Sequence, residues 1–182
     1  MCDILNLESI KIRDAKTSDS KPITELIIGE RRTAERDPNF GDYLFIKRPS
    51  HSQLSERFKN RYKDYSSGNA VFKVAEHGGR VIGYCFVKKK DIPNSELSHV
   101  GVLSIRVGKG FRGKGVGTKL MTESLNRCRG RFEIIELNFL AINDVARRLY
   151  KNFGFKKWGT GPDFVKRGRK YIDMEYMYLR LK

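Results

Sequence analysis

The stretch HVGVLSIRVGKGFRGKGVGTKLM, residues 99–121, decides the fold of this 182-residue chain. It contains the apolar, β-branched run VGVLSIRV, which predicts a strand over about residues 97–107. The segment GKGFRGKGVGT follows at 108–118, and the apolar residues beyond it recur at helical spacing, which predicts a helix over 114–127. The sequence therefore predicts a strand, a glycine-rich loop and a helix in direct succession.

Two phosphate-binding motifs fit this loop poorly. Gly108, Gly110 and Gly113 match the dinucleotide pattern G-x-G-x-x-G, but too few residues follow for the further strand–helix units of a Rossmann fold. Glu133, the acid at about the right distance, precedes the next predicted strand instead of ending it. The P-loop pattern fails because Gly115 stands where a hydroxyl residue would bind magnesium.

A third pattern, Arg112-x-x-Gly115-x-Gly117, has a direct physical interpretation. Glycines let the backbone approach phosphate oxygens closely, and amides at a helix N-terminus point at the anion with the support of the helix dipole. Arg112 and Lys114 add positive charge. A tight strand-to-helix turn without a ligand is the alternative. Three glycines and two cations within six residues exceed what such a turn requires.

This glycine-rich stretch resembles the cofactor-binding motif of the GNAT superfamily of N-acetyltransferases. A second stretch agrees with the family at the expected distance: Asn143-Asp144-Val145-Ala146, then Leu149-Tyr150, then Asn152-Phe153-Gly154-Phe155. The two motifs in this order are far more specific than either motif alone. The resemblance is carried by residues 70–158, and before residue 70 it rests on the order of the elements.

The resemblance implies an α+β fold in one domain over residues 1–182, with a mixed, mostly antiparallel seven-stranded sheet and about four helices. The sheet of this family is splayed between its fourth and fifth strands, here 97–107 and 136–142, and the pantetheine of acetyl-coenzyme A (acetyl-CoA) inserts in the gap. The glycine loop surrounds the pyrophosphate. The implied cofactor-binding residues are Ile105, Arg106, Val107, Arg112, Gly113, Lys114, Gly115, Val116, Gly117, Thr118, Asn143 and Tyr150.

Acetyl transfer to an amine requires that two protons move. The amine must be neutral when it attacks, and the leaving thiolate must be stabilised or protonated. The resemblance implies Tyr150 as the acid for the thiolate. The helical spacing of Ala146, Leu149, Tyr150 and Phe153 also fits a core aromatic residue, so both roles stay open.

The base that takes the proton of the amine is a separate question. His99 stands thirteen residues before Arg112, where some family members have a glutamate. The ordinary pKa of an imidazole, about 6.5, suits proton removal at neutral pH. Glu96, Ser104 and water-mediated transfer are the alternatives. The predicted catalytic residues are therefore Tyr150 and His99, with no metal.

The remaining elements follow from periodicity and turn residues. Ile10 and Ile12 alternate with basic residues, which predicts an edge strand. Residues 41–49 show no clear period and are predicted as loop. The other predicted elements are helices over 18–36 and 50–65, hairpin strands over 70–76 and 81–88, a strand over 134–142, a helix over 144–152 capped by Asn143 and closed by Gly154, and a final strand pair over 155–158 and 171–181.

Composition limits the class of protein. The chain is 39% hydrophobic and 32% charged, as in soluble globular proteins, and its apolar runs are too short for a membrane helix. No export signal is recognised at the N-terminus. Cys2, Cys85 and Cys128 are few, odd in number and far apart, which argues against a disulfide framework and predicts a cytoplasmic location.

The net charge of +16 implies attraction to polyanions. Residues 147–170 hold nine basic residues and one acid, Asp163, and a solvated basic face explains this segment as well as a binding surface does. The predicted partner is an amine substrate, a small molecule or a protein, with no membrane and a homodimer left open. A nucleic-acid-binding module and a non-catalytic acyl-CoA-binding regulator are the rival functions, and an acidic acceptor pocket would involve Asp37, Asp42 and Glu96.

Overall fold

The computed structural model describes residues 9–36, 49–90 and 96–181. In chain order the strands and α-helices are β1 (Lys11–Asp14), α1 (Ser20–Arg36), α2 (His51–Ser66), β2 (Ala70–His77), β3 (Arg80–Lys89), β4 (Val100–Val107), α3 (Val116–Cys128), β5 (Ile134–Leu140), α4 (Asp144–Asn152), β6 (Lys156–Arg167) and β7 (Lys170–Arg180). Short 3-10 turns lie at Thr17–Asp19, Leu97–His99 and Lys109–Phe111.

The strands form one seven-stranded sheet in the order β1-β2-β3-β4-β5-β7-β6. Every neighbouring pair is antiparallel except β4 and β5, which are parallel. A parallel pair needs a crossover, and α3 supplies it between β4 and β5. The predicted α+β fold, with its mixed, mostly antiparallel sheet and four helices, is confirmed.

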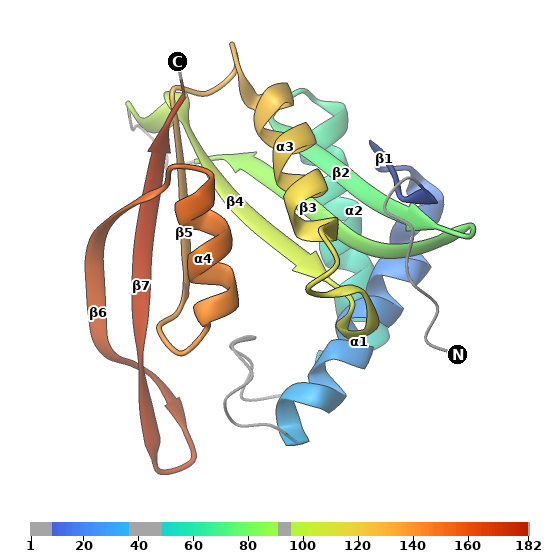
Figure 1. Ribbon diagram of the computed structural model, residues 1–182. Helices are drawn as coiled ribbons and strands as arrows, with labels where there is room; N and C mark the ends of the chain where they lie inside the picture. Colours follow the sequence, from blue (N-terminus) through green and yellow to red (C-terminus); the bar gives the residue numbers. More distant parts are fainter. Residues whose placement is uncertain (1–8, 37–48, 91–95, 182) are drawn as a thin grey trace.

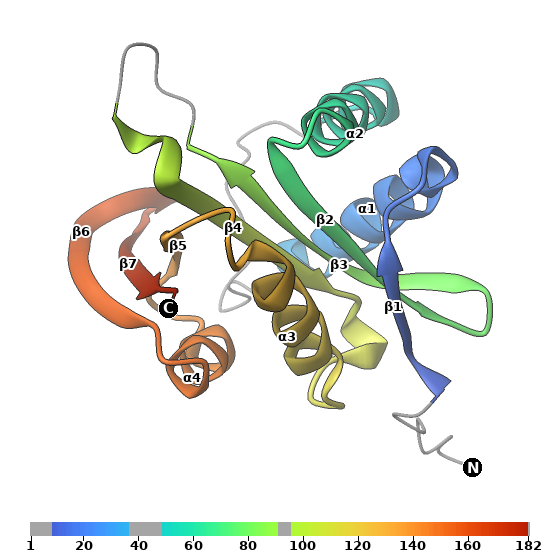
Figure 2. The same ribbon diagram turned by 90° about the horizontal axis from the view of Figure 1, so that it is seen from above.

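Helices cover both faces of the sheet, α1 and α2 on one face and α3 and α4 on the other (Figures 1 and 2). Each face has its own apolar core. The core under α3 includes Leu120, Met121 and Ile135, which are almost completely buried. The core under α1 and α2 is rich in aromatic residues, among them Phe58 and Phe72. The alternation of side chains along the strands produces this division.

Most predicted elements are present, but several of their boundaries differ from the prediction. Residues 97–99 form a 3-10 turn, so β4 begins at Val100 and His99 is not on the strand. Helix α3 begins at Val116 because Gly115 before it has a left-handed backbone, with φ 74°. Strand β6 continues to Arg167, well beyond the predicted end at residue 158. The segment GTGPD, residues 159–163, lies inside β6, where the pairing with β7 is irregular between Gly161 and Val165.

The last two strands form a long ribbon with aromatic side chains exposed on it. Trp158, Phe164 and Tyr171 are each more than half exposed, and Trp158 and Phe164 lie next to the ring of Tyr176.

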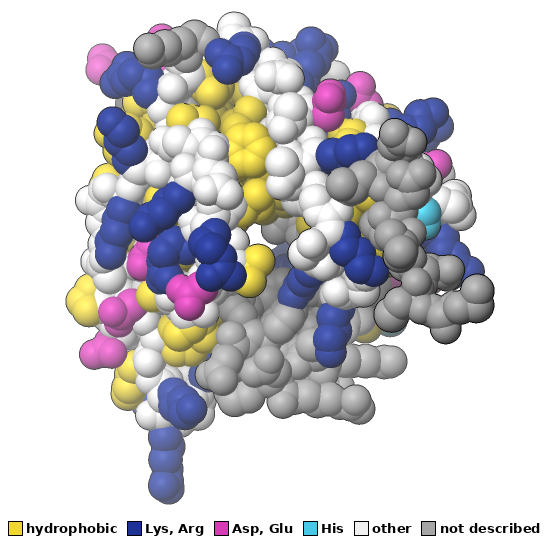
Figure 3. Space-filling view, in the orientation of Figure 1, with side chains coloured by type: hydrophobic (Ala, Val, Ile, Leu, Met, Phe, Trp, Pro, Cys, Tyr) yellow, Lys and Arg dark blue, Asp and Glu magenta, His cyan; other side chains and the backbone are white. Residues whose placement is uncertain are grey.

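Lys and Arg side chains with some Asp and Glu among them are spread over the face shown in Figure 3. This distribution matches a solvated basic surface.

The cysteines within the described residues form no disulfide. Cys85 and Cys128 are free and fully buried, and burial raises the pKa of each thiol to about 12. Within the described parts of the chain, no helix is both long enough and apolar enough to cross a bilayer.

Candidate active site

The sheet opens between β4 and β5. The two strands pair at only three positions, Val100 with Ile134, Gly101 with Ile135 and Val102 with Glu136. Beyond Val102, β4 stays paired with β3 as far as Val107, while β5 pairs with β7 (Figure 1). The predicted splay between the fourth and fifth strands is therefore present, with its closed end at the start of both strands.

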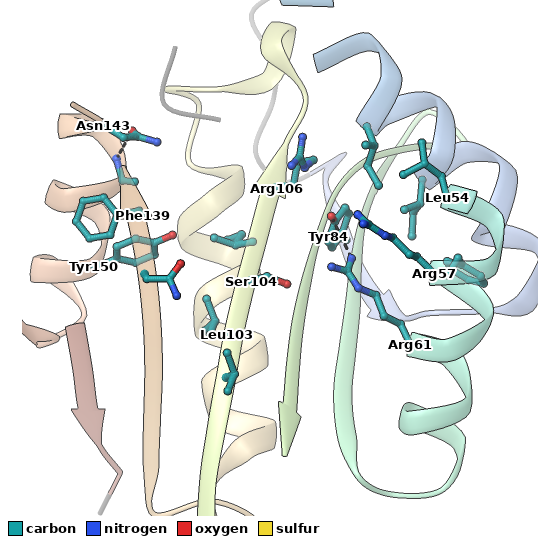
Figure 4. Close-up of a pocket in the computed structure, with 17 residues that line it drawn as sticks. Leu54, Arg57, Arg61, Tyr84, Leu103, Ser104, Arg106, Phe139, Asn143 and Tyr150 are labelled. Atoms are coloured by element: carbon teal, nitrogen blue, oxygen red, sulfur yellow. Dashed lines mark hydrogen bonds between the residues drawn. The ribbon is translucent and has the colours of Figure 1, made fainter. Parts of the chain in front are cut away.

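A cavity of about 330 Å³ lies along this opening. It is lined from β4 and β5, from α4 on one side, and from α1, α2 and β3 on the other (Figure 4). The polar and charged lining residues are Arg57, Arg61, Tyr84, Ser104, Arg106, Asn138, Asn143 and Tyr150. Apolar side chains supply the remainder of the wall.

Tyr150 projects from α4 with its hydroxyl directed toward β4 (Figure 4). Its ring is buried between Phe139 and Phe155, with ring centroids 5.3 and 5.8 Å away. The ring is therefore part of the core, while the residue also lines the cavity. The two roles that the sequence left open for Tyr150 are compatible in this structure.

The glycine loop has the backbone that only glycine adopts easily. Gly113 and Gly115 have φ values of 69° and 74°. Nothing lies within 4 Å of the position that a side-chain Cβ would take at Gly113, so the loop is open there. Gly117 lies inside α3 and faces Leu149 of α4, where an added Cβ would come within 3.4 Å of a methyl group. The first two glycines therefore shape the loop, whereas a side-chain Cβ at position 117 would make only an ordinary van der Waals contact with α4.

Arg112 ties this loop to the end of β4. Its Nε donates a hydrogen bond of 2.8 Å to the Val107 carbonyl. Burial lowers the pKa of the guanidinium to about 10, so it stays charged at neutral pH. A fixed, partly desolvated cation beside the N-terminus of α3 attracts anions more strongly than a cation in bulk water.

The predicted site residues fall into two groups. Ile105, Arg106, Asn143 and Tyr150 all line the cavity. The Asn143 side chain also accepts a 3.0 Å hydrogen bond from the Ala146 amide, which confirms the predicted cap of α4. The loop residues Arg112, Gly113, Lys114, Gly115, Val116, Gly117 and Thr118, and the strand end Val107, lie outside the lining, where β4 leads into α3.

His99 is not brought together with Tyr150. It lies in the 3-10 turn before β4, at the closed end of the opening, and does not line the cavity. Its Nδ1 is 3.0 Å from the Glu96 carbonyl. Of the alternative bases, Ser104 lines the cavity and Glu96 does not. Asp37 and Asp42 of the suggested acidic pocket lie outside the described residues.

The sequence motifs did not reveal the residues that α2 brings to the cavity. Arg57 and Arg61 lie on the same side of α2, four residues apart, and Tyr84 of β3 and Asn138 of β5 complete the polar lining. The spacing of the two arginines was visible in the sequence. The position of α2 over the opening depends on long-range packing, so the sequence did not show that these arginines line a cavity.

The model of the acetyltransferase (GNAT) family matches residues 37–155, more than half of the chain. The chain belongs to the acetyltransferase (GNAT) family. Acetyl-CoA is therefore its acetyl donor, and the enzyme is an N-acetyltransferase.

Curated relatives of this acetyltransferase extend over most of its length. The L-amino acid N-acetyltransferase AaaT of Escherichia coli K12 is 28% identical over 173 residues, covering 94% of this chain and 98% of AaaT. The N-alpha-acetyltransferase RimI of Mycobacterium tuberculosis is 29% identical over 145 residues, covering 79% and 84%.

Solved structures agree with the acetyltransferase in fold. An N-acetyltransferase from Staphylococcus aureus Mu50 superposes with a TM-score of 0.80 at 20% identity, covering 95% of this chain and 99% of that one. The protein yncA of Salmonella typhimurium, solved with its cofactor acetyl-CoA, gives a TM-score of 0.79 at 20% identity, covering 96% and 95%.

The residues of this chain fit such a donor. The parted β4 and β5 leave an edge of β4 that β5 does not cover, and an extended chain can add to such an edge. The open loop at Gly113 and the helix N-terminus after Gly115 suit a pyrophosphate. Both features are built from the chain itself.

Proposed function

We propose that this enzyme transfers an acetyl group from acetyl-CoA directly to a primary amine that is bound in the cavity. The observation that carries the proposal is the opening between β4 and β5, because it puts one cavity in contact with the edge of β4 and with Tyr150. Acetyl-CoA supplies the activated acetyl group as a thioester. Direct transfer needs only that amine and thioester meet in the same cavity.

In this proposal, the backbone of Ile105, Arg106 and Val107 holds the pantetheine along the edge of β4. Residues 112–118 hold the pyrophosphate, and Asn143 anchors the pantetheine from the start of α4. Backbone N–H groups of β4 polarise the carbonyl that the amine attacks, because fixed donors in a site that excludes water stabilise a developing negative charge.

Tyr150 acts as the proposed acid. Its hydroxyl donates a proton to the sulfur as the carbon–sulfur bond breaks, and its packed ring fixes the direction of that hydroxyl. His99 remains the predicted base for the amine. Because His99 does not line the cavity, it would take the proton through intervening water.

The first test replaces Tyr150 by phenylalanine. The ring and its packing against Phe139 and Phe155 are retained, so the melting temperature should stay close to that of the wild type, while kcat falls about 100-fold and KM for acetyl-CoA changes little. Release of free thiol from acetyl-CoA is the measurement, with a panel of amines as acceptors. Tyr171→Phe, at an exposed tyrosine of β7, is the matched control. Full activity of Tyr150→Phe would exclude Tyr150 as the acid.

The second test concerns His99. If His99 takes the proton of the amine, His99→Gln lowers kcat mainly below the pKa of the amine, where the amine still carries that proton. Above that pH the variant should approach the wild type. The pH–rate profiles of the two proteins decide the point, and superimposable profiles would remove His99 from the mechanism.

The rival functions are tested by thermal unfolding. An enzyme that binds acetyl-CoA gains stability from it at raised salt. A nucleic-acid-binding module would instead be stabilised by an oligonucleotide, and this effect would disappear as salt is added. A regulator that only binds acyl-CoA would be stabilised by acetyl-CoA but would release no thiol with any amine.

A further inference from the structure

We infer that the acceptor is a small free amino acid whose carboxylate is bound by the α2 arginines, Arg57 and Arg61. This inference rests on the proposed function, because it names the class of amine that the same cavity accepts. Four properties of the cavity support it: the sign of its charge, the way Arg61 is held, its apolar wall and its size.

Positive charge dominates the side of the cavity that faces α2. Arg57 and Arg61 line it from α2 and Arg106 lines it from β4, and no Asp or Glu is found among the lining residues that the structure describes. In Figure 4 the guanidinium groups of Arg57 and Arg61 reach from α2 toward Tyr84. A polyamine or a lysine side chain would enter against this charge, whereas a carboxylate is attracted by it.

Arg61 is held in a fixed position. Its Nη1 donates a 3.2 Å hydrogen bond to the Tyr84 hydroxyl, and its guanidinium lies 5.4 and 5.1 Å from the ring centroids of Tyr84 and Phe86. A guanidinium has five N–H donors in a planar fork, and this geometry matches the two oxygens of a carboxylate. Because the two rings orient Arg61 in advance, less conformational entropy is lost when an anion binds.

The remaining wall beside α2 suits an aliphatic or aromatic side chain. Ile23 and Ile27 of α1 and Leu54 and Phe58 of α2 line the cavity next to the arginines. A volume of about 330 Å³ is at the small end of the range for small-molecule sites. An amino acid can place its carboxylate on Arg57 and Arg61, its side chain on this apolar wall and its amine toward the opening and Tyr150.

The charge also distinguishes a free amino acid from the N-terminus of a protein. In a peptide, the group next to the amine-bearing carbon is a neutral amide. Such an acceptor gains nothing from two guanidinium groups at that place, and it must also desolvate them. The cavity therefore favours the free amino acid over the peptide.

The experiment compares matched acceptors. Leucine, methionine and phenylalanine are each assayed beside their α-amides, which keep the amine and the side chain but lack the negative charge. The amine of the amide is the less basic, so more of it is neutral at a given pH, and any preference for the free acid must come from the carboxylate. We expect kcat/KM to be on the order of tenfold or more higher for at least one free acid than for its amide.

Variants of α2 assign that preference to the arginines. Arg57→Gln and Arg61→Gln should each lower the ratio of free acid to amide toward one, and Arg61→Lys should restore part of it. Arg127→Gln, on the exposed side of α3 and outside the cavity, is the control and should leave the ratio unchanged. Because Arg61 also packs on two rings, the exposed Arg57 provides the variant that does not disturb the core.

Failure of the inference and failure of the proposed function give different results. Equal or better turnover of the amides, of a polyamine or of a peptide, or a ratio unchanged in both glutamine variants, would overturn the amino-acid acceptor and leave the acetyltransferase. Absence of thiol release with every amine would overturn the proposed function. In that case thermal shifts with leucine and leucinamide decide the carboxylate site: stabilisation by leucine that Arg57→Gln removes supports it, and equal shifts refute it.

Discussion

Asp19 shows how a single residue connects two elements. It is a buried carboxylate that accepts hydrogen bonds from Arg13 of β1, at 2.7 and 2.8 Å, and from the Lys16 amide, at 2.7 Å. Burial by itself would raise the pKa of Asp19, but these hydrogen bonds and the charge of Arg13 lower it below its ordinary value. These hydrogen bonds connect the edge strand β1 to the start of α1.

Asp19→Asn should lower the free energy of unfolding at pH 7 by about 1–3 kcal/mol, because a buried charged hydrogen-bond partner is lost. Since the folded-state pKa of Asp19 is lowered, its contribution is present above the ordinary carboxyl pKa of about 4 and is lost as the pH falls through the folded-state value. Urea unfolding at several pH values measures the difference in free energy of unfolding between wild type and variant. This difference should become smaller below about pH 4.

Asp14→Asn is the control for this prediction. Asp14 is exposed and pairs with Lys73 at 2.9 Å, so its replacement should cost less than about 1 kcal/mol. A gap for Asp19→Asn that stays constant down to pH 2 would contradict the linkage between Asp19 and stability.

Among the elements, the glycine loop is the one for which the proposed binding of acetyl-CoA and the backbone geometry both require glycine. Gly113 and Gly168 both have a positive φ, 69° and 59°, and an added Cβ would meet nothing within 4 Å at either position. Alanine should therefore destabilise both sites by a similar amount, about 1 kcal/mol. Only Gly113→Ala should also reduce the thermal stabilisation by acetyl-CoA, because Gly168 lies in the β6–β7 turn.

Thermal unfolding with and without acetyl-CoA tests this pair of variants. Stabilisation by acetyl-CoA that is reduced equally in both would mean that the loop has no special role. Stabilisation that is intact in Gly113→Ala would place the pyrophosphate elsewhere.

Local patterns in the sequence predicted most elements but not all of their limits. The two-residue period of β2 and β3 and the glycine turn between them were sufficient to predict that hairpin. The predicted end of β6 at residue 158 was wrong. Glycine and proline in GTGPD usually break a strand, but here pairing with β7 resumes after an irregular stretch. His99 was predicted on a strand because nothing local distinguishes a strand end from a short 3-10 turn.

At the scale of the whole molecule, the cavity exists because two parts of the sheet meet at only one end. Gly101 lies at that closed end, where an added Cβ would come within 2.9 Å of Ile135 and Val87 side-chain atoms and 3.1 Å of the Phe132 ring. These neighbours are buried, so the space is already filled. The two strands therefore meet at this end with no room for a side chain at position 101.

Gly101→Ala should lower the free energy of unfolding by about 1–3 kcal/mol through overpacking at the closed end. Gly29→Ala is a useful comparison, because nothing lies near its Cβ position and alanine is favoured over glycine in a helix, so this variant should be neutral or slightly more stable. Urea denaturation measures both variants. Equal stability of Gly101→Ala and wild type would show that the closed end accommodates the added methyl group.

The acceptor side of the cavity illustrates what a sequence pattern does not reveal. The glycine loop and Tyr150 lie in motifs, so their residues could be named in advance. Arg57 and Arg61 lie in an ordinary amphipathic helix, and their meaning comes only from the packing of α2 against β2 and β3. That packing joins elements far apart in the chain, and short-range patterns do not report it.

The two buried sulfhydryl groups of the sheet core have a practical consequence. A thiol reacts with a coloured disulfide reagent only as the thiolate anion. Because the pKa values of Cys85 and Cys128 are about 12, almost none of either thiol is ionised in a mildly alkaline buffer. The native enzyme should therefore add little background from these positions when free coenzyme A is titrated by colour.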